Sequence, residues 1–225
     1  RPGASGSRRG GEVRARMPGE RMSPCDLDLT RARADDLQTV WFSPIADDRY
    51  VTDRAWERAV LDECPFHPAG GCGLVRHGSY PRVQPAGARV ARFWCPTQRE
   101  TISLLPAFLA ARLRGTLEEI EAVIDVAECA WSVSAAADTA RPAEADEAVT
   151  SISAVRWLRR RVRPIAAALL AIVTLVPELA GCAPTLAAIR ARLGVAHVLL
   201  VLRQLACSYL GALAPPLGLR ARGGR

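Results

Sequence analysis

The apolar positions of the second half of the chain follow a helical period. Between residues 151 and 176 they recur in alternating steps of three and four, the spacing that places side chains on one face of a helix. These positions are Val155, Leu158, Val162, Ile165, Leu169, Ile172 and Val176. We therefore predict one long helix there, with a buried apolar seam.

Shorter helical patterns surround this segment. Thr116 followed by Glu119 has the spacing of a capping box, which predicts a helix beginning near residue 117. Further helices are expected over 133–139, 185–193 and 196–213, with polar or proline-containing breaks between them.

Upstream, the pattern changes to the alternation typical of strands. Residues 74–80 and 89–94 predict a β-hairpin, and 101–105 predict a third short strand. Before this sheet, we expect two short helices, at 29–40 and at 53–61, the second with Asp53 as its N-cap.

Cysteine and histidine flank the predicted hairpin at a spacing typical of metal ligands. Cys64, His67 and Cys72 precede it and Cys95 follows it, in the pattern C-x2-H-x4-C-x22-C. Thiolates and imidazole favour Zn2+ in a tetrahedral site. A standard ribbon would have a further cysteine at the position of Gln98. The sequence thus leaves two alternatives: His67 completes a zinc site, or the site has lost its metal.

These patterns predict a mostly α fold with a small β zinc ribbon. The expected organisation is a disordered tail (1–24), short helices (25–63), the zinc ribbon (64–105), a helical helix-turn-helix-like domain (106–218) and a second tail (219–225).

The charge of the chain favours a polyanionic partner. The net charge is +7, and all 30 basic residues are arginines, which bind phosphate with a planar fork of donors. On the long helix, one face carries Arg156, Arg159, Arg160 and Arg163, and the predicted ribbon carries Arg76, Arg89 and Arg92. We expect these residues to contact nucleic acid; the alternative is that they form solvated faces.

Enzymatic and membrane functions have little support. The acidic residues crowd into 26–63 and 118–147, rather than being distributed over strands as a two-metal nuclease would require. The longest apolar run, 165–176, has 12 residues, and a bilayer span needs about 20. Residues 1–22 lack the apolar stretch of a signal peptide, and so we expect a cytoplasmic protein without a membrane partner. The sequence favours a binding protein and leaves enzymatic activity open.

One segment resembles a known family. Residues 64–124 are similar to an uncharacterised bacterial zinc-ribbon family, often described as transposases or mobile-element accessory proteins. The resemblance is carried by Cys64-Pro65, Gly71-Cys72-Gly73, residues 76–80, residues 93–96 and residues 101–106. It implies association with DNA, and the run 156–160 looks like a transposase helix-turn-helix segment. The competing hypothesis is a protein–protein interaction module with a structural zinc ribbon, in which the apolar seam docks a partner helix.

Overall fold

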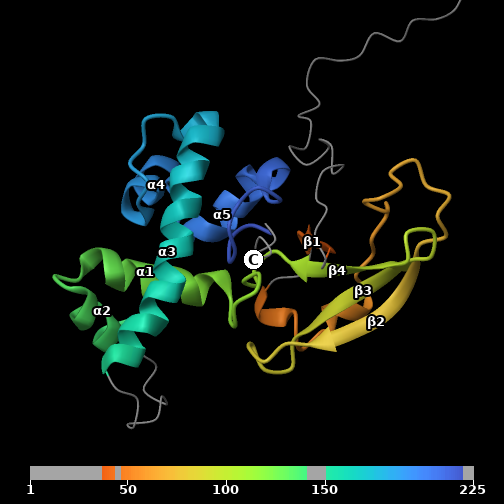
Figure 1. Cartoon of the computed structure of the whole chain (residues 1–225), viewed down its shortest axis with the longest axis horizontal. Helices are drawn as coiled ribbons and strands as arrows, with labels where there is room; N and C mark the ends of the chain where they lie inside the picture. The colour runs from red at the N-terminus through yellow and green to blue at the C-terminus, as the bar shows by residue number, and fades with distance from the viewer. Residues whose placement is uncertain (1–36, 44–46, 141–150, 220–225) are drawn as a thin grey trace, which may run out of the picture.

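The protein divides into a sheet on one side and helices on the other (Figure 1). The computed structural model describes residues 37–43, 47–140 and 151–219. Within these ranges there are five α-helices and a four-stranded mixed sheet, with short 3-10 turns between them. The predicted class, mostly α with a small β unit, is confirmed at this level.

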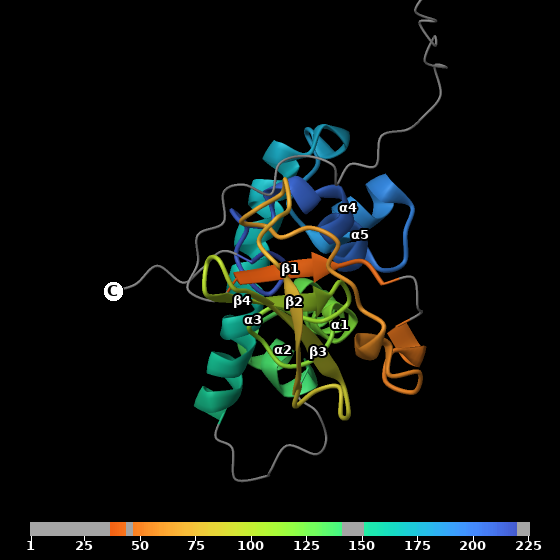
Figure 2. The same ribbon diagram turned by 90° about the vertical axis from the view of Figure 1, so that its right-hand side faces the viewer.

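The sheet contains the predicted hairpin and a strand that was not expected. Strands β2 (Val75–Pro81) and β3 (Arg89–Cys95) form the predicted hairpin, and the predicted third strand, β4 (Glu100–Pro106), pairs antiparallel to β3. Strand β1 (Leu37–Trp41) pairs parallel to β4 at the edge of the sheet (Figure 2). The predicted helix 29–40 is therefore wrong over 37–40, because the open edge of β4 supplies hydrogen bonds that a local pattern does not reveal. Residues 29–36 lie outside the described residues.

The predicted helix at 53–61 is also wrong. Within it the structure has only the short 3-10 turn η2 (Ala55–Glu57), which follows a first 3-10 turn, η1 (Asp47–Arg49), and Arg54 between the two turns has a φ of 50°. A left-handed residue interrupts an α-helix, and here it lets Trp56 turn into the core beneath the sheet. The carboxylate of Asp53 accepts a hydrogen bond from Arg49 at 3.3 Å instead of capping a helix.

Tyr50 holds these turns against the sheet. Its ring lies 5.7 Å from that of Trp56 and 5.2 Å from that of Phe108, and its hydroxyl donates to the carbonyl of Arg89 at 2.7 Å. Burial raises the pKa of Tyr50 above its usual value, so the hydroxyl remains a donor at neutral pH. Aromatic packing therefore replaces helical hydrogen bonding in this segment.

The helical half contains α1 (Leu117–Cys129), α2 (Val133–Ala140), α3 (Ser151–Leu175), α4 (Leu186–Leu193) and α5 (Val198–Leu205). The predicted capping box is present: Thr116 and Glu119 exchange hydrogen bonds at the start of α1. The helix expected over 196–213 is too long, since α5 ends at Leu205. After it the chain turns back, so that Leu210, Leu213 and Leu217 enter the core.

Helix α3 has two different faces, one buried and one exposed. Its seam is buried at Leu158, Ile165, Leu169 and Ile172 and half-buried at Val155 and Val162, as the period predicted. Its opposite face is solvent-exposed and basic, and Pro164 lies inside the helix. Among the described residues, no helix combines the length and apolar character needed to cross a membrane.

Acidic side chains of α1 bind the beginnings of α4 and α5. Glu121 accepts hydrogen bonds from the backbone amides of Val198 and Leu199, both at 2.9 Å. Glu128 accepts from the amides of residues 186 and 187 at 2.8 and 3.2 Å. The first amides of a helix have no partner within it and carry partial positive charge, so these carboxylates orient both helices.

Arg203 joins the helical half to the end of the sheet. Its side chain is fully buried and donates to the carbonyls of Ala107 (2.6 Å), Leu109 (2.7 Å), Leu217 (2.9 Å) and Pro216. Burial lowers the pKa of Arg203 to about 9, which still leaves the guanidinium protonated at neutral pH. A single side chain thus fixes α5, the segment after β4 and the C-terminal turn together.

The seam generates a first prediction. Leu169→Ala should lower the free energy of unfolding by ~2–5 kcal/mol, because it removes a fully buried side chain and leaves a cavity. Chemical denaturation of both proteins measures the difference. Leu170→Ala is the matched control, since Leu170 is 58% exposed and its loss should have little effect. Equal stabilities of the two variants would contradict the assignment of the seam.

The Arg203 network generates a second prediction. Arg203→Ala should destabilise the protein by about 3 kcal/mol or more, because it leaves buried carbonyls without a donor. Arg203→Lys keeps the charge but cannot supply the planar fork of donors. The stability of this variant should therefore lie between that of the parent and that of Arg203→Ala. Thermal unfolding checks the order, and a lysine variant as stable as the parent would show that charge alone is sufficient.

Candidate metal centre and basic groove

The predicted metal ligands converge at the end of the sheet remote from the helices (Figure 1). Cys64, His67 and Cys72 lie in the loop that precedes β2, and Cys95 is the last residue of β3. A short bridge between Cys64 and His67, with a 2.9 Å hydrogen bond from the His67 amide to the Cys64 carbonyl, folds the first turn. The four ligand atoms all lie within 4.8 Å of one another.

The distances between these atoms suit a tetrahedral ion. His67 Nδ1 lies 3.7 Å from Cys64 Sγ and 3.5 Å from Cys95 Sγ. Zinc bonds of about 2.3 Å to sulfur and 2.0 Å to nitrogen at tetrahedral angles would separate S and N by ~3.6 Å. The three cysteines are buried and form no disulfide. The four side chains can therefore hold one metal ion.

Backbone amides point at the sulfur atoms. The amide of Gln98 donates to Cys95 Sγ at 3.4 Å, and those of Phe66 and His67 donate to the Cys64 sulfur. These bonds favour a thiolate, but burial outweighs them and raises the pKa of Cys64 to about 11. A cation at the centre of the four ligands would supply the positive charge that stable thiolates require.

The turn after Cys72 favours a glycine. Gly73 has a φ of 67°, a left-handed conformation that other residues adopt only with strain, and a Cβ there would contact Pro96 at 3.6 Å. Thr97 Oγ1 lies 3.3 Å from the Cys72 carbonyl, as its hydrogen-bond donor. The turns of Cys72 and Cys95 are thus packed on each other. Gln98, which replaces the expected ligand, contributes its backbone amide instead.

His77, the remaining histidine of the ribbon, is outside this cluster. Its ring lies 6.0 Å from that of Trp94 on the neighbouring strand. His77 therefore packs against Trp94 from the middle of β2 and is not one of the four ligands.

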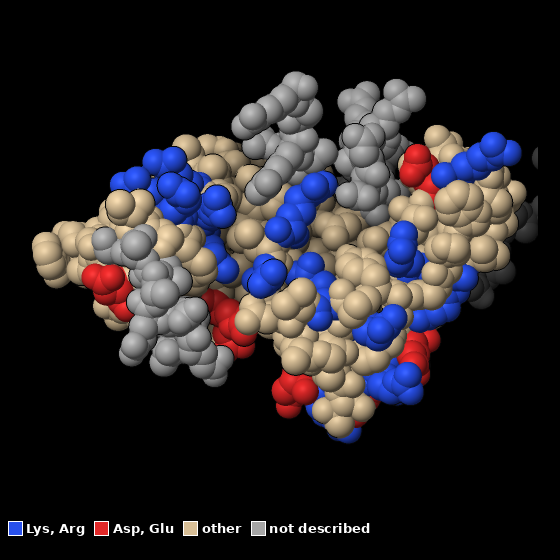
Figure 3. Space-filling view, turned by 60° about the horizontal axis from the view of Figure 1, so that its bottom comes forward, with Lys and Arg blue, Asp and Glu red and all other residues tan. Residues whose placement is uncertain are grey.

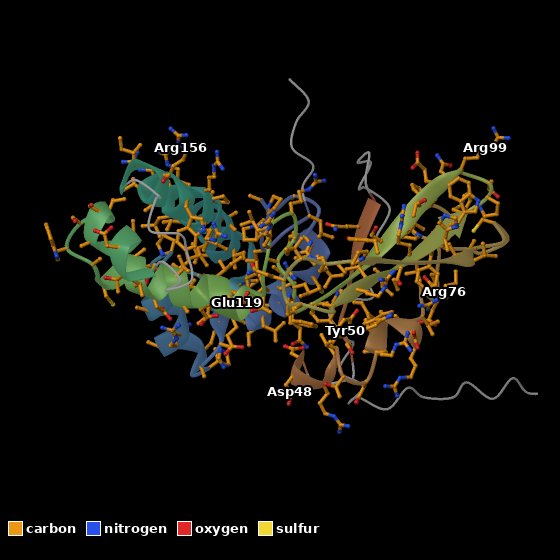
Figure 4. The ribbon with its side chains drawn as sticks, turned by 90° about the horizontal axis from the view of Figure 1, so that it is seen from below. Asp48, Tyr50, Arg76, Arg99, Glu119 and Arg156 are labelled. Carbon is orange, nitrogen blue, oxygen red and sulfur yellow. The ribbon has the colours of Figure 1, made fainter. Side chains whose placement is uncertain are left out.

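The four arginines of α3 form a second candidate site. Arg156, Arg159, Arg160 and Arg163 are exposed and line one hollow of about 1030 Å3, together with Leu113, Ile152, Val155 and Pro164. Arg156 projects away from the helices (Figure 4), and basic side chains gather at this end of the molecule (Figure 3). No described carboxylate lines the hollow or pairs with these four guanidinium groups.

The ribbon arginines have different surroundings. Arg76 donates to the carbonyls of Ala59 (2.9 Å) and Trp56, and Arg89 donates to Ser79 at 2.9 and 3.0 Å. Arg76 therefore binds β2 to the segment of the second 3-10 turn, and Arg89 binds β3 to β2. The guanidinium of Arg92 instead lies 5.9 Å from the ring centroid of Tyr80, and its buried Nε has no hydrogen-bond partner among the described residues.

A helix-turn-helix stays a prediction. Helices α2 and α3 pack against each other around Ala136, Ala137, Ala154 and Leu158. Their connection, residues 141–150, lies outside the described residues and is longer than the three or four residues typical of that motif.

The sequence did not reveal a set of polar residues on one face of the sheet. Gln38, Ser103 and Tyr80 share a small hollow there with Arg92 and Arg112. The sequence around Gln38, Ser103 and Tyr80 shows no unusual cluster of charge, and Gln38 belongs to the strand that was expected to be helical. Only the alternation of β4, which places Ser103 between buried residues, indicated that one of them would face away from the core.

Comparison of the chain with protein-family models, with curated proteins and with solved structures gives no match in any of the three. The resemblance to a zinc-ribbon family therefore stays a prediction, and the two sites are interpreted from their own residues.

Proposed function

We propose that this protein binds DNA through the basic face of α3 and that its ribbon is held together by one Zn2+. The observation that carries this proposal is the hollow of about 1030 Å3 that four exposed arginines line, without a described carboxylate. No catalytic step is part of the proposal. The role in a mobile element rests on the resemblance of residues 64–124 and stays a prediction.

The chemistry of the cluster supports zinc over other metals. Calcium and magnesium prefer oxygen ligands, whereas this centre offers three sulfurs and one imidazole nitrogen. Four protein ligands would leave no open position, which is typical of a structural zinc site rather than a catalytic one. The ion would stabilise the end of the sheet and take no part in a reaction.

The geometry of α3 supports contacts with phosphates. Residues at i, i+3, i+4 and i+7 lie on one side of a helix, so the four guanidinium groups can meet a single stretch of backbone. Apart from Val155, which also lines the hollow, the apolar seam faces the opposite way and packs among the protein's own side chains. Binding to this face would therefore leave the core undisturbed.

Binding of a partner protein is the alternative function, and the partner would need to bind a surface other than the seam. The seam expected to receive a partner helix packs instead on residues of α1, α2, α4 and α5. Two other apolar side chains favour this alternative: Trp131 is 91% exposed and Ile152 is 70% exposed. Large apolar groups left in water are typical of protein contacts when they form a patch.

Zinc binding is tested by metal analysis. Purified protein refolded with excess Zn2+ should contain one zinc ion per chain, and Cys72→Ser should lose it together with stability, because metal binding and folding of such modules are coupled. Cys129→Ser is the matched control, since Cys129 is exposed and outside the cluster. A Cys72→Ser variant that keeps stoichiometric zinc and unchanged stability would refute the site.

DNA binding is tested by removing charge from α3. The double change Arg159→Ala and Arg160→Ala should lower the affinity for duplex DNA at least tenfold, which is about 1.4 kcal/mol, and should leave thermal stability nearly unchanged. The slope of log affinity against log salt should fall by about one unit for each phosphate that the protein no longer neutralises. Fluorescence anisotropy over a series of salt concentrations measures both quantities.

The matched control removes the same charge elsewhere. Arg49 and Arg54 are 67% and 66% exposed and are paired with Asp53 and Glu57 on the 3-10 turns. Changing both to alanine should leave DNA affinity within about twofold of the parent. If the two double variants bind alike, the α3 face is only solvated; if the parent does not bind DNA, the partner-protein alternative is favoured.

A further inference from the structure

One face of the sheet carries a row of polar side chains that crosses all four strands. In the register of the sheet, Gln38 on β1 is opposite Ser103 on β4, and Ser103 is opposite Arg92 on β3. Tyr80 on β2 is opposite Val90, two residues before Arg92, so it lies on the same face. Opposite residues in neighbouring strands are close in space, and the row is therefore continuous.

These side chains surround a hollow of about 240 Å3. Gln38, Tyr80, Arg92 and Ser103 form its base, and Arg112, from the segment after β4, completes the lining. Arg112 is exposed and has a φ of 58°, a left-handed conformation outside any helix or strand. The site thus draws on five segments of the chain and differs from the metal centre and from the α3 groove in all of its residues.

Among the described residues, the lining is rich in hydrogen-bond donors and includes no carboxylate. Two guanidinium groups, two hydroxyls and one amide face the hollow. In the part of the chain that the structure describes, the buried Nε of Arg92 has no hydrogen-bond partner, and neither arginine forms an ion pair. A buried donor without an acceptor is unfavourable, and two cations that share a hollow repel each other, so an anion would relieve both conditions.

We propose that this hollow binds a small oxyanion, the phosphate or carboxylate group of a ligand, between Arg92 and Arg112. Arginine binds both groups with two parallel hydrogen bonds, and the hydroxyls of Ser103 and Tyr80 can donate to the remaining oxygens. The volume is below the range of pockets for drug-sized ligands, which fits a small anion. This proposal does not depend on DNA binding by α3, since the two sites share no residue.

The test is a titration of the zinc-loaded full chain, labelled with 15N, with inorganic phosphate and separately with acetate. The reporter is the Nε–H resonance of Arg92, identified by its absence from the spectrum of Arg92→Gln. Phosphate or acetate should shift this resonance in a saturable way, and the anion that binds more tightly identifies the ligand as phosphoryl or carboxyl. Calorimetry of the same titration provides the affinity.

Two variants test the residues, and one tests the independence of the site. Arg92→Gln and Arg112→Gln should each weaken binding at least tenfold, which is about 1.4 kcal/mol. Arg112 is exposed, so its change keeps the test valid even if Arg92→Gln disturbs the sheet. The double change Arg159→Gln and Arg160→Gln should leave the affinity unaltered. A shift that does not saturate with either anion, or equal affinities of the parent and Arg112→Gln, would overturn the proposal.

Discussion

The burial of Arg203 is the constraint on which the arrangement of the two halves depends. A cation removed from water is stable only when its hydrogen-bonding groups are satisfied, and here the acceptors are backbone carbonyls from two distant parts of the chain. Ala107 and Leu109 follow the last strand, and Leu217 belongs to the C-terminal turn. The guanidinium therefore binds α5 to the sheet and to the chain end at the same point, and neither connection can move without exposing a charge or a carbonyl.

Other charged side chains also hold separate segments of the chain together through hydrogen bonds. Glu121 binds the start of α5 and also pairs with Arg190 at 2.8 Å, so one carboxylate positions two helices. On the sheet side, Arg76 and Arg89 bind the 3-10 turns and the hairpin through carbonyls and a hydroxyl. Since the chain has no lysine, the same residue type serves as internal clasp and as surface charge. Contacts, and not residue type, distinguish the arginines that can meet a ligand.

The exposed arginines and the Cys/His cluster lie in different parts of the molecule. The exposed arginines of α3 lie at one end of the molecule, and the Cys/His cluster lies at the far end of the sheet (Figure 1). A closed zinc site would therefore stabilise the ribbon without touching DNA held by α3. The oxyanion hollow, on the sheet face between them, would be a third and separate feature.

Local patterns were sufficient wherever a short stretch of chain decides the outcome. The hairpin, the capping box of Thr116, the seam of α3 and the four ligands Cys64, His67, Cys72 and Cys95 all follow from period and spacing. Tertiary structure decided what depends on distant partners. β1 exists because the edge of β4 was open, the helix expected at 53–61 gave way to aromatic packing, and the partners of Arg203 are far from it in sequence. The roles of the arginines belong to this second group, because burial and hydrogen-bond acceptors are properties of the folded chain.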